Sequence, residues 1–205
     1  MSEQSLKTKP TKKQLILWIT LAVSALVAIV TVILMDFTSL GVPTIQKITG
    51  KGLIDSKVYY SSSGLYEYLE NFNDEAIHAL LTVHAIDYVF MLAVCVLEIT
   101  VLLLLSKHNW KVLFFGAFPF LELFFDVSEN MFVDFAIKKL PEKASMLSGL
   151  AGGMTLCKWI FTVLYLVCAF TMIGIVIAKK IKAKKKVENE ALANENETQE
   201  NVDKD

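Results

Sequence analysis

The chain has 205 residues and a formal net charge of −1, and 54% of its residues are hydrophobic. Its mean hydropathy of +0.50 is high for a soluble domain and ordinary for a membrane protein. All 20 basic residues are lysine, which disfavours any site that needs a bidentate arginine for phosphate or carboxylate.

No catalytic or metal-binding motif is present in the sequence. The three cysteines, Cys95, Cys157 and Cys168, lie in apolar runs, without a CxxC motif or a cysteine–histidine ligand spacing. The chain also lacks a GxSxG, an HExxH and a glycine-rich phosphate loop. We therefore predict no catalytic residue, no metal site and no cofactor, and we interpret the cysteines as small core residues.

The first apolar run, 15–35, carries no charge over 21 residues, which is long enough to cross a bilayer. A basic tail, 1–14, precedes it, so a cleaved signal peptide is the competing interpretation. The run is longer than the apolar part of a typical signal peptide, and no small-residue cleavage site follows it. We therefore predict a retained first membrane helix.

A long polar connection, 36–75, follows the first helix. Glycines and a proline between positions 41 and 52 predict an irregular chain in its first part. Apolar residues then recur at helical spacing after a serine cluster, which predicts a short amphipathic helix over 63–72. This helix is expected to lie on the membrane surface or to cover the bundle. A connecting helix without a role in ligand binding is the plainer interpretation.

Three further membrane helices are predicted, over 76–105, 112–137 and 150–178. Pro119 lies inside the second of these and is expected to kink it. The tail, 179–205, is basic and then acidic, and its low apolar content predicts disorder. The predicted fold class is all-α: a polytopic membrane protein built as a four-transmembrane-helix bundle, with a short extracellular amphipathic helix.

Four spans place both termini on the same side of the membrane. The proposed inner segments carry about twice as many lysines as the proposed outer loops, so we predict cytoplasmic termini and a location in the plasma membrane. A lysine cluster in the tail is expected to fix this topology and to contact anionic lipid: Lys179, Lys180, Lys182, Lys184, Lys185 and Lys186. No nucleic-acid partner is expected, because no aromatic residue is interleaved among these lysines. A homo-oligomer and a protein partner for the tail both remain open.

Polar residues inside the predicted spans form the candidate site, because carboxylates in lipid are costly and need protein or water around them. The stretch LELFFDVSEN (121–130) places three carboxylates on one side of a helix through spacings of four and three. Helix rise places Asp87 and Lys158 at a depth similar to that of Asp126 and Glu129, with His84 one turn further out. The candidates for binding a ligand or proton are His84, Asp87, Glu98, Glu122, Asp126, Glu129, Asn130 and Lys158.

Two interpretations of this cluster are open. Lys158 pairs with one or two acids and locks the packing of the helices, or the excess of acids over lysine forms a site. An uncompensated buried carboxylate takes up a proton or holds a cation, which favours a site. Glu98 and Glu122 lie nearer the midplane without a basic partner. A proton shuttle and a pair of neutral, hydrogen-bonded acids are both compatible with that position.

Three short motifs occur at corresponding depths: Ile86-Asp87-Tyr88-Val89-Phe90, Asp126-Val127-Ser128-Glu129-Asn130 and Lys158-Trp159. In this pattern the chain resembles, over 15–178, a group of uncharacterised prokaryotic four-helix integral membrane proteins. The resemblance implies that the group shares the aspartates, the glutamate, the asparagine and the lysine of these motifs, and it implies no activity. Met91 stands where a proline often follows the first motif. A fold-level likeness extends to the sterol isomerase and sigma-2 receptor class.

The sequence thus predicts an integral membrane protein whose intramembrane cluster of acids and lysine binds or relays a proton, a cation or a small ligand. The first alternative is a structural or accessory membrane protein, in which the cluster only locks the helices together. The second is a lipid-modifying enzyme of the sterol-isomerase type that uses the acids and His84 for proton transfer. An enzyme is the less favoured class.

Overall fold

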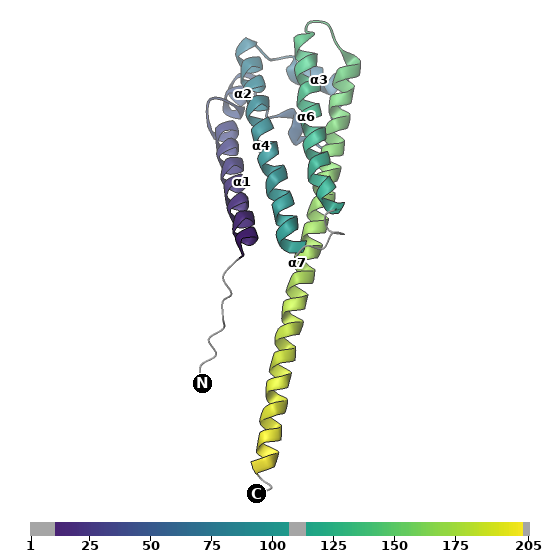
Figure 1. Ribbon diagram of the computed structural model, residues 1–205. Helices are drawn as coiled ribbons and strands as arrows, with labels where there is room; N and C mark the ends of the chain where they lie inside the picture. The colour runs from purple at the N-terminus through teal and green to yellow at the C-terminus, as the bar shows by residue number, and fades with distance from the viewer. Residues whose placement is uncertain (1–10, 107–113, 203–205) are drawn as a thin grey trace. The chain divides into compact units, whose positions relative to one another are not determined.

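The computed structural model describes residues 11–106 and 114–202, which form helices and turns without a β-strand (Figure 1). The prediction of an all-α chain is therefore confirmed for the described residues. Three segments are long and apolar enough to cross a membrane: Lys12–Thr49, Asp74–Ser106 and Ser145–Glu190. They contain the predicted spans 15–35, 76–105 and 150–178. Most of the basic tail 1–14, and the connection between the second and third predicted spans, lie outside the described residues.

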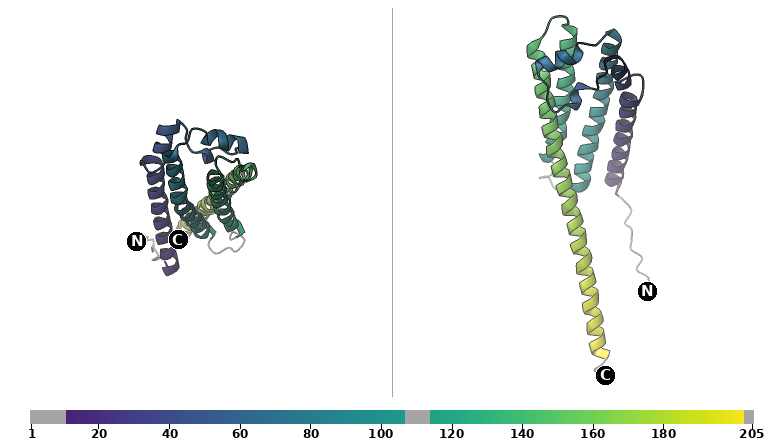
Figure 2. Two further views of the ribbon diagram at one scale, coloured as in Figure 1. Left: turned by 90° about the horizontal axis from the view of Figure 1, so that it is seen from above. Right: turned by 180° about the vertical axis from the view of Figure 1, so that it is seen from behind.

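The chain divides into two compact units, 1–166 and 167–205. The first unit contains α1 (Lys12–Phe37), α2 (Val42–Thr49), the 3-10 turn η1 (Ile54–Ser56), α3 (Ser62–Leu69), α4 (Asp74–Ser106), the 3-10 turn η2 (Phe114–Gly116), α6 (Ala117–Lys138) and the beginning of α7 (Ser145–Val202). The second unit contains the remainder of α7. In the first unit α4 lies between α1 and α6 and contacts both, as two views of the ribbon agree (Figures 1 and 2).

The connection between α1 and α4 is more regular than the sequence predicts. Its glycines and proline delimit α2 instead of breaking the chain: Pro43 stands in the first turn, and Gly50 ends the helix in the left-handed conformation with φ 71°. A side chain on Gly41, the residue before α2, would collide with the backbone of Met35. The connection therefore turns back tightly on α1 because that position has no side chain.

The amphipathic helix predicted over 63–72 is α3, which begins at Ser62 and ends at Leu69. Ser61 caps it by accepting a hydrogen bond from the Gly64 amide at 3.1 Å. The same connection supplies much of the hydrophobic core, since its apolar side chains pack against α4 and α6. The core includes Ile45, Ile54, Leu65, Leu80, Val133 and Ala151. The connection is thus folded onto the helices, which positions its polar side chains near them.

α7 approaches this connection closely. Gly152 lies against the carbonyl oxygen of Tyr60, where a side chain would collide, and Ser148 exchanges a hydrogen bond of 2.6 Å with Ser62. Small residues let two backbones come together in this way. α7 begins at Ser145, five residues before the predicted start of the fourth span.

The predicted kink at Pro119 is wrong, because α6 begins at Ala117 and Pro119 is its third residue. The first-turn amides of a helix have no partner within the helix, so proline loses no hydrogen bond there. The predicted helix 112–137 accordingly starts later and ends at Lys138.

The predicted disorder of 179–205 is wrong for 179–202, because α7 continues to Val202, and the last three residues lie outside the described part of the chain. No glycine or proline follows Gly174, and the alanine, lysine, glutamate and glutamine that prevail there are strong helix formers. Lys186 and Glu190 add an ion pair of 3.6 Å between successive turns. Charge and low hydropathy prevent this segment from forming a hydrophobic core of its own, but a helix whose side chains are all exposed to solvent needs no such core.

Candidate functional site

Lys158, in the first unit, is the centre of a buried polar network. Its side chain projects from α7 and is only 7% exposed. The Nζ atom lies 2.9 Å from Glu129 Oε2, 3.1 Å from Asp126 Oδ1 and 3.9 Å from Asp55 Oδ2. One ammonium group therefore faces three carboxylates, which come from α6 and η1.

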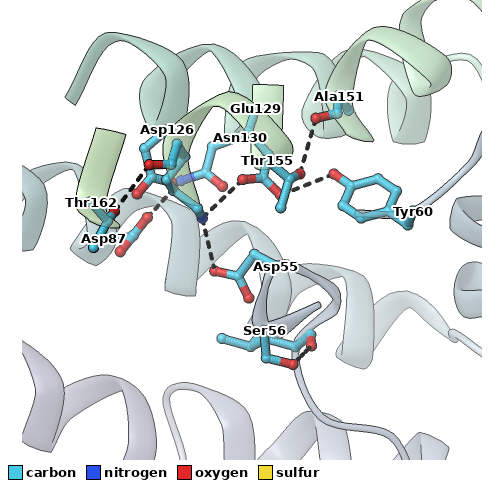
Figure 3. A network of polar contacts seen from close by, with 12 residues as sticks. Asp55, Ser56, Tyr60, Asp87, Asp126, Glu129, Asn130, Ala151, Thr155 and Thr162 are labelled. Carbon is cyan, nitrogen blue, oxygen red and sulfur yellow. Dashed lines mark hydrogen bonds and ion pairs between the residues drawn. The ribbon is translucent and has the colours of Figure 1, made fainter. Parts of the chain in front are cut away.

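The spacing along α6 presents the network's acids together. Asp126, Glu129 and Asn130 are three and four residues apart, and all three are buried. Figure 3 shows Tyr60 pointing towards Glu129, and its hydroxyl donates a hydrogen bond of 3.1 Å to Glu129 Oε1. Both oxygens of Glu129 are thus occupied, one by Tyr60 and the other by Lys158.

Tyr60 donates a hydrogen bond to this network and does not ionise. Burial, and to a lesser degree the charge of Glu129, raises the pKa of the Tyr60 phenol well above its usual value. The phenol therefore stays neutral over the whole physiological range. Its hydrogen remains available to hold the Glu129 carboxylate in place.

α4 joins the network through Asp87. Asn130 donates a hydrogen bond of 2.7 Å from Nδ2 to Asp87 Oδ2. Figure 3 shows this aspartate near Asp126, on the same side of the network. The predicted members Asp87, Asp126, Glu129 and Asn130 are therefore in one place, together with Lys158.

His84 lies one turn from Asp87 on α4, and it has its own partner. Its Nδ1 atom is 2.6 Å from Asp134 Oδ1, on α6. The sequence reading missed Asp134, although it continues the four-residue spacing of Asp126 and Asn130. His84 thus forms a second polar link between α4 and α6 beside the main network.

Glu98 and Glu122 are a separate pair of acids. Glu98 is 7% exposed, and one carboxyl oxygen of each glutamate is buried without a hydrogen-bond partner among the described residues. The two carboxyl groups interact electrostatically with each other. Tyr165 approaches Glu98, but its hydroxyl contacts the backbone oxygen, at 3.5 Å. Glu122 nevertheless lies beside the main network, because it lines a cavity with Asp126 and Lys158.

Asp55 and Tyr60 are members of the network that the sequence did not predict as site residues. Both belong to the connection between α2 and α3, where hydropathy does not indicate how deep a residue lies in the membrane. Figure 3 shows Asp55 directed from its turn towards the acids of α6. Only the folding of the connection onto the core brings these two residues to the site.

Two small cavities meet at this network. One has a volume of about 190 Å³ and is lined by residues that include His84, Glu129 and Asn130. The other has a volume of about 290 Å³ and is lined by residues that include Glu122, Asp126, Lys158 and Trp159. Asp55, Asp87 and Phe90 line both cavities. The space beside these three residues therefore combines carboxyl groups with apolar walls and is enclosed in part by protein.

The charge of the network is unbalanced. Four carboxyl groups, those of Asp55, Asp87, Asp126 and Glu129, accompany one lysine. An uncompensated carboxylate away from water is costly unless it gains a proton or a cation. Among the described residues, no group of three histidine, cysteine, aspartate or glutamate side chains has the geometry to hold a metal ion. The excess of carboxyl groups is therefore suited to attracting positive charge.

The long apolar helices and the buried polar network define an α-helical membrane protein. No protein-family model, curated protein or solved structure matches the chain. The site itself is therefore the basis for inferring function.

Proposed function

We propose that the protein is a four-span membrane protein whose polar cavity binds a cation. The observation that carries the proposal is the position of Lys158, which neutralises part of an acidic cluster and leaves Asp55 and Asp87 beside open space. A network built only for packing has no need of a cavity bordered by excess acids. A bound cation would supply the missing positive charge.

α6 is the proposed fourth span. Its 22 residues give a helix of about 33 Å, which is sufficient for the hydrocarbon core. Its charged side chains lower its hydropathy, but Asp126 and Glu129 are buried in the protein. Phe120, Phe124, Met131 and Phe135 are exposed and would contact lipid. Partnered polar residues facing the bundle interior are the usual arrangement in a membrane helix.

The proposed orientation has both termini in the cytoplasm and the membrane domain in the plasma membrane. Under this orientation α3 is the short extracellular helix that covers the bundle. The six lysines between 179 and 186 are exposed, which supports contact with anionic lipid on the cytoplasmic side. The motifs around Asp87, Asp126 and Lys158 support membership of the prokaryotic four-helix group.

A structural role is the second candidate, and one observation favours it. The 2.9 Å and 3.1 Å contacts of Lys158 tie α7 to α6, so the network stabilises the packing of these helices whether or not it binds a ligand. The two roles differ in one measurable respect. A structural lock has no dependence on the cation in solution, whereas a site does.

The test is cation-dependent stability of the full chain in nanodiscs made from lipids without amine head groups. Unfolding temperature is measured in sodium, potassium, ammonium and choline chlorides against bulky N-methylglucamine chloride at equal ionic strength. The proposal expects at least one small cation to raise the unfolding temperature, and Asp87→Asn to remove that rise. Glu75→Gln, an exposed substitution on the same helix, is the matched control. Equal unfolding temperatures in all salts would contradict the proposal.

A further inference from the structure

We infer that the cation is a compact organic ammonium compound, whose charged group lies between Asp55 and Asp87 and whose carbon atoms lie against Phe90 and Trp159. This inference rests on the proposed function and specifies its ligand. It follows from the hydrogen-bonding capacity, the walls and the size of the two cavities.

The cavity offers hydrogen-bond acceptors. Asp87 Oδ2 is occupied by Asn130, and Asp126 Oδ1 by Lys158, whereas the second oxygen of each carboxyl group receives no hydrogen bond from the described residues. Asp126 is only 6% exposed and lines the larger cavity. A carboxylate oxygen beside a cavity can accept a hydrogen bond from a bound donor. An ammonium group brings both positive charge and N–H donors.

An inorganic cation fits the same space poorly. A bare sodium or potassium ion needs a shell of several oxygen atoms, and many secondary transporters supply these from carbonyls at a break in a helix. α4, α6 and α7 run through the site without a break, so their carbonyls are used within the helices. The cavities of about 190 and 290 Å³ also exceed the roughly 30 Å³ that one water occupies.

Aromatic residues line the space beside the acids. Phe90 lines both cavities, and Trp159, which follows Lys158 on α7, lines the larger one. Aromatic rings attract cations through their negative faces and also bury carbon atoms, and tryptophan is the strongest of them. Carboxylates next to aromatic walls are therefore matched to an ammonium group attached to carbon.

The volumes limit the size of the ligand. Both cavities lie at or below the lower end of the range for sites that hold drug-sized molecules, roughly 300 Å³. The structure thus fits an alkylammonium group of a few carbon atoms. Such a group is available from a free primary amine and from the head group of an ethanolamine lipid, and both present the same positive charge and the same N–H donors.

The experiment is a calorimetric titration of the full chain in nanodiscs with ethylammonium, choline and potassium chlorides as probes. One set of nanodiscs contains only phosphatidylglycerol, and the other also contains phosphatidylethanolamine. Binding of an ammonium probe at least tenfold tighter than potassium supports the inference. Equal affinity in both sets identifies a free amine as the ligand. Weaker apparent affinity in the ethanolamine set identifies the lipid head group as a competitor for the site.

Substitutions in the walls separate recognition from folding. Phe90→Leu and Trp159→Leu are each expected to weaken ammonium binding by about tenfold and to change potassium binding little, because they remove only the aromatic face. Phe124→Leu, on the exposed face of α6, is the control and should leave binding unchanged. Circular dichroism and the unfolding temperature report whether each variant is folded.

The failures of the two proposals are distinguishable. If potassium or sodium binds as tightly as the ammonium probes and depends on Asp87, the protein is a cation-binding protein and the organic ligand is overturned. If ammonium binding survives both aromatic substitutions undiminished, the assigned walls are wrong. If no cation binds in either set of nanodiscs, both the organic ligand and the proposed function are overturned.

Discussion

Lys158 on α7 lies 2.9 Å from Glu129 on α6, and both side chains are buried, with exposures of 7% and 1%. The pair is completed from outside the helices, since Tyr60 holds the other oxygen of Glu129. Asp126 shares the same lysine at 3.1 Å. Glu129 and its ion pair with Lys158 thus join α6, α7 and the segment that carries Tyr60, and several consequences for stability can be measured.

Removing the charge of Lys158 should be strongly destabilising. Lys158→Met leaves the carboxylates of Asp126 and Glu129 without their cation, which is expected to cost about 3–5 kcal/mol. Unfolding in nanodiscs or mixed micelles measures the loss. Adding Asp126→Asn to that variant should restore part of the stability, because it removes one of the uncompensated charges. Additive effects of the two substitutions would contradict the ion pair.

The Tyr60 hydroxyl should contribute measurably to the free energy of unfolding. Tyr60→Phe removes its bond to Glu129 and should lower the free energy of unfolding by about 1–3 kcal/mol. Tyr59→Phe, at the exposed neighbouring tyrosine, is the matched control and should have little effect. Equal effects of the two substitutions would show that the bond to Glu129 is not formed.

The same tyrosine predicts a dependence on alkaline pH. Its pKa is raised in the folded chain, so folding favours the neutral phenol. The stabilisation is complete below the unfolded pKa of about 10 and decreases as pH rises above it. The unfolding temperature of the native chain should therefore decline more steeply above this pH than that of Tyr60→Phe. Parallel curves would contradict the buried position of the phenol.

Close packing at Gly152 gives a steric prediction. Gly152→Ala places a methyl group against the carbonyl oxygen of Tyr60 and should destabilise the protein by about 1–3 kcal/mol. Gly153→Ala meets no other atom and should be neutral or slightly stabilising, as alanine favours a helix. The two variants differ by one position, which makes the comparison well matched. Equal stability would exclude the contact of α7 with the 60–62 segment.

Four spans and three spans differ in where the two ends of the domain lie. In a background without native cysteine, Glu70→Cys and Glu188→Cys introduce thiols at exposed positions before α4 and late in α7. An impermeant maleimide added to intact cells should label position 70 and leave position 188 unlabelled until the cells are lysed. If α6 did not cross the membrane, both positions would lie on the same side and would be labelled together.

The sequence contained enough information to place much of the helical framework. Long apolar runs are sufficient to predict α1, α4 and the start of α7, because a membrane-crossing segment must be a helix or part of a closed barrel. Residues on one helix, such as Asp126 and Glu129, could be placed together from helical spacing alone. Lys158 could be predicted to lie near them because it has a similar depth in its own span and because a buried lysine needs acidic partners.

Contacts that depend on the folding of the connection could not be predicted in this way. Asp55 and Tyr60 reach the site because α2 and α3 pack on the core, and local sequence carries no signal for that approach. Asp134 had a signal in its spacing, but it lies near the end of α6, where a charged residue needs no explanation. The high charge and low hydropathy of the segment after Lys179 predict disorder, whereas its strong helix formers favour the helix that the structure shows.

A cryo-electron microscopy structure of the full chain in a nanodisc with saturating ethylammonium would show whether a cation occupies the cavity. We expect density for a compact ligand between Asp55 and Asp87, with Lys158 still bound to Asp126 and Glu129. A structure in which the same side chains close together around no added density, at a concentration that saturates any calorimetric signal, would contradict this expectation.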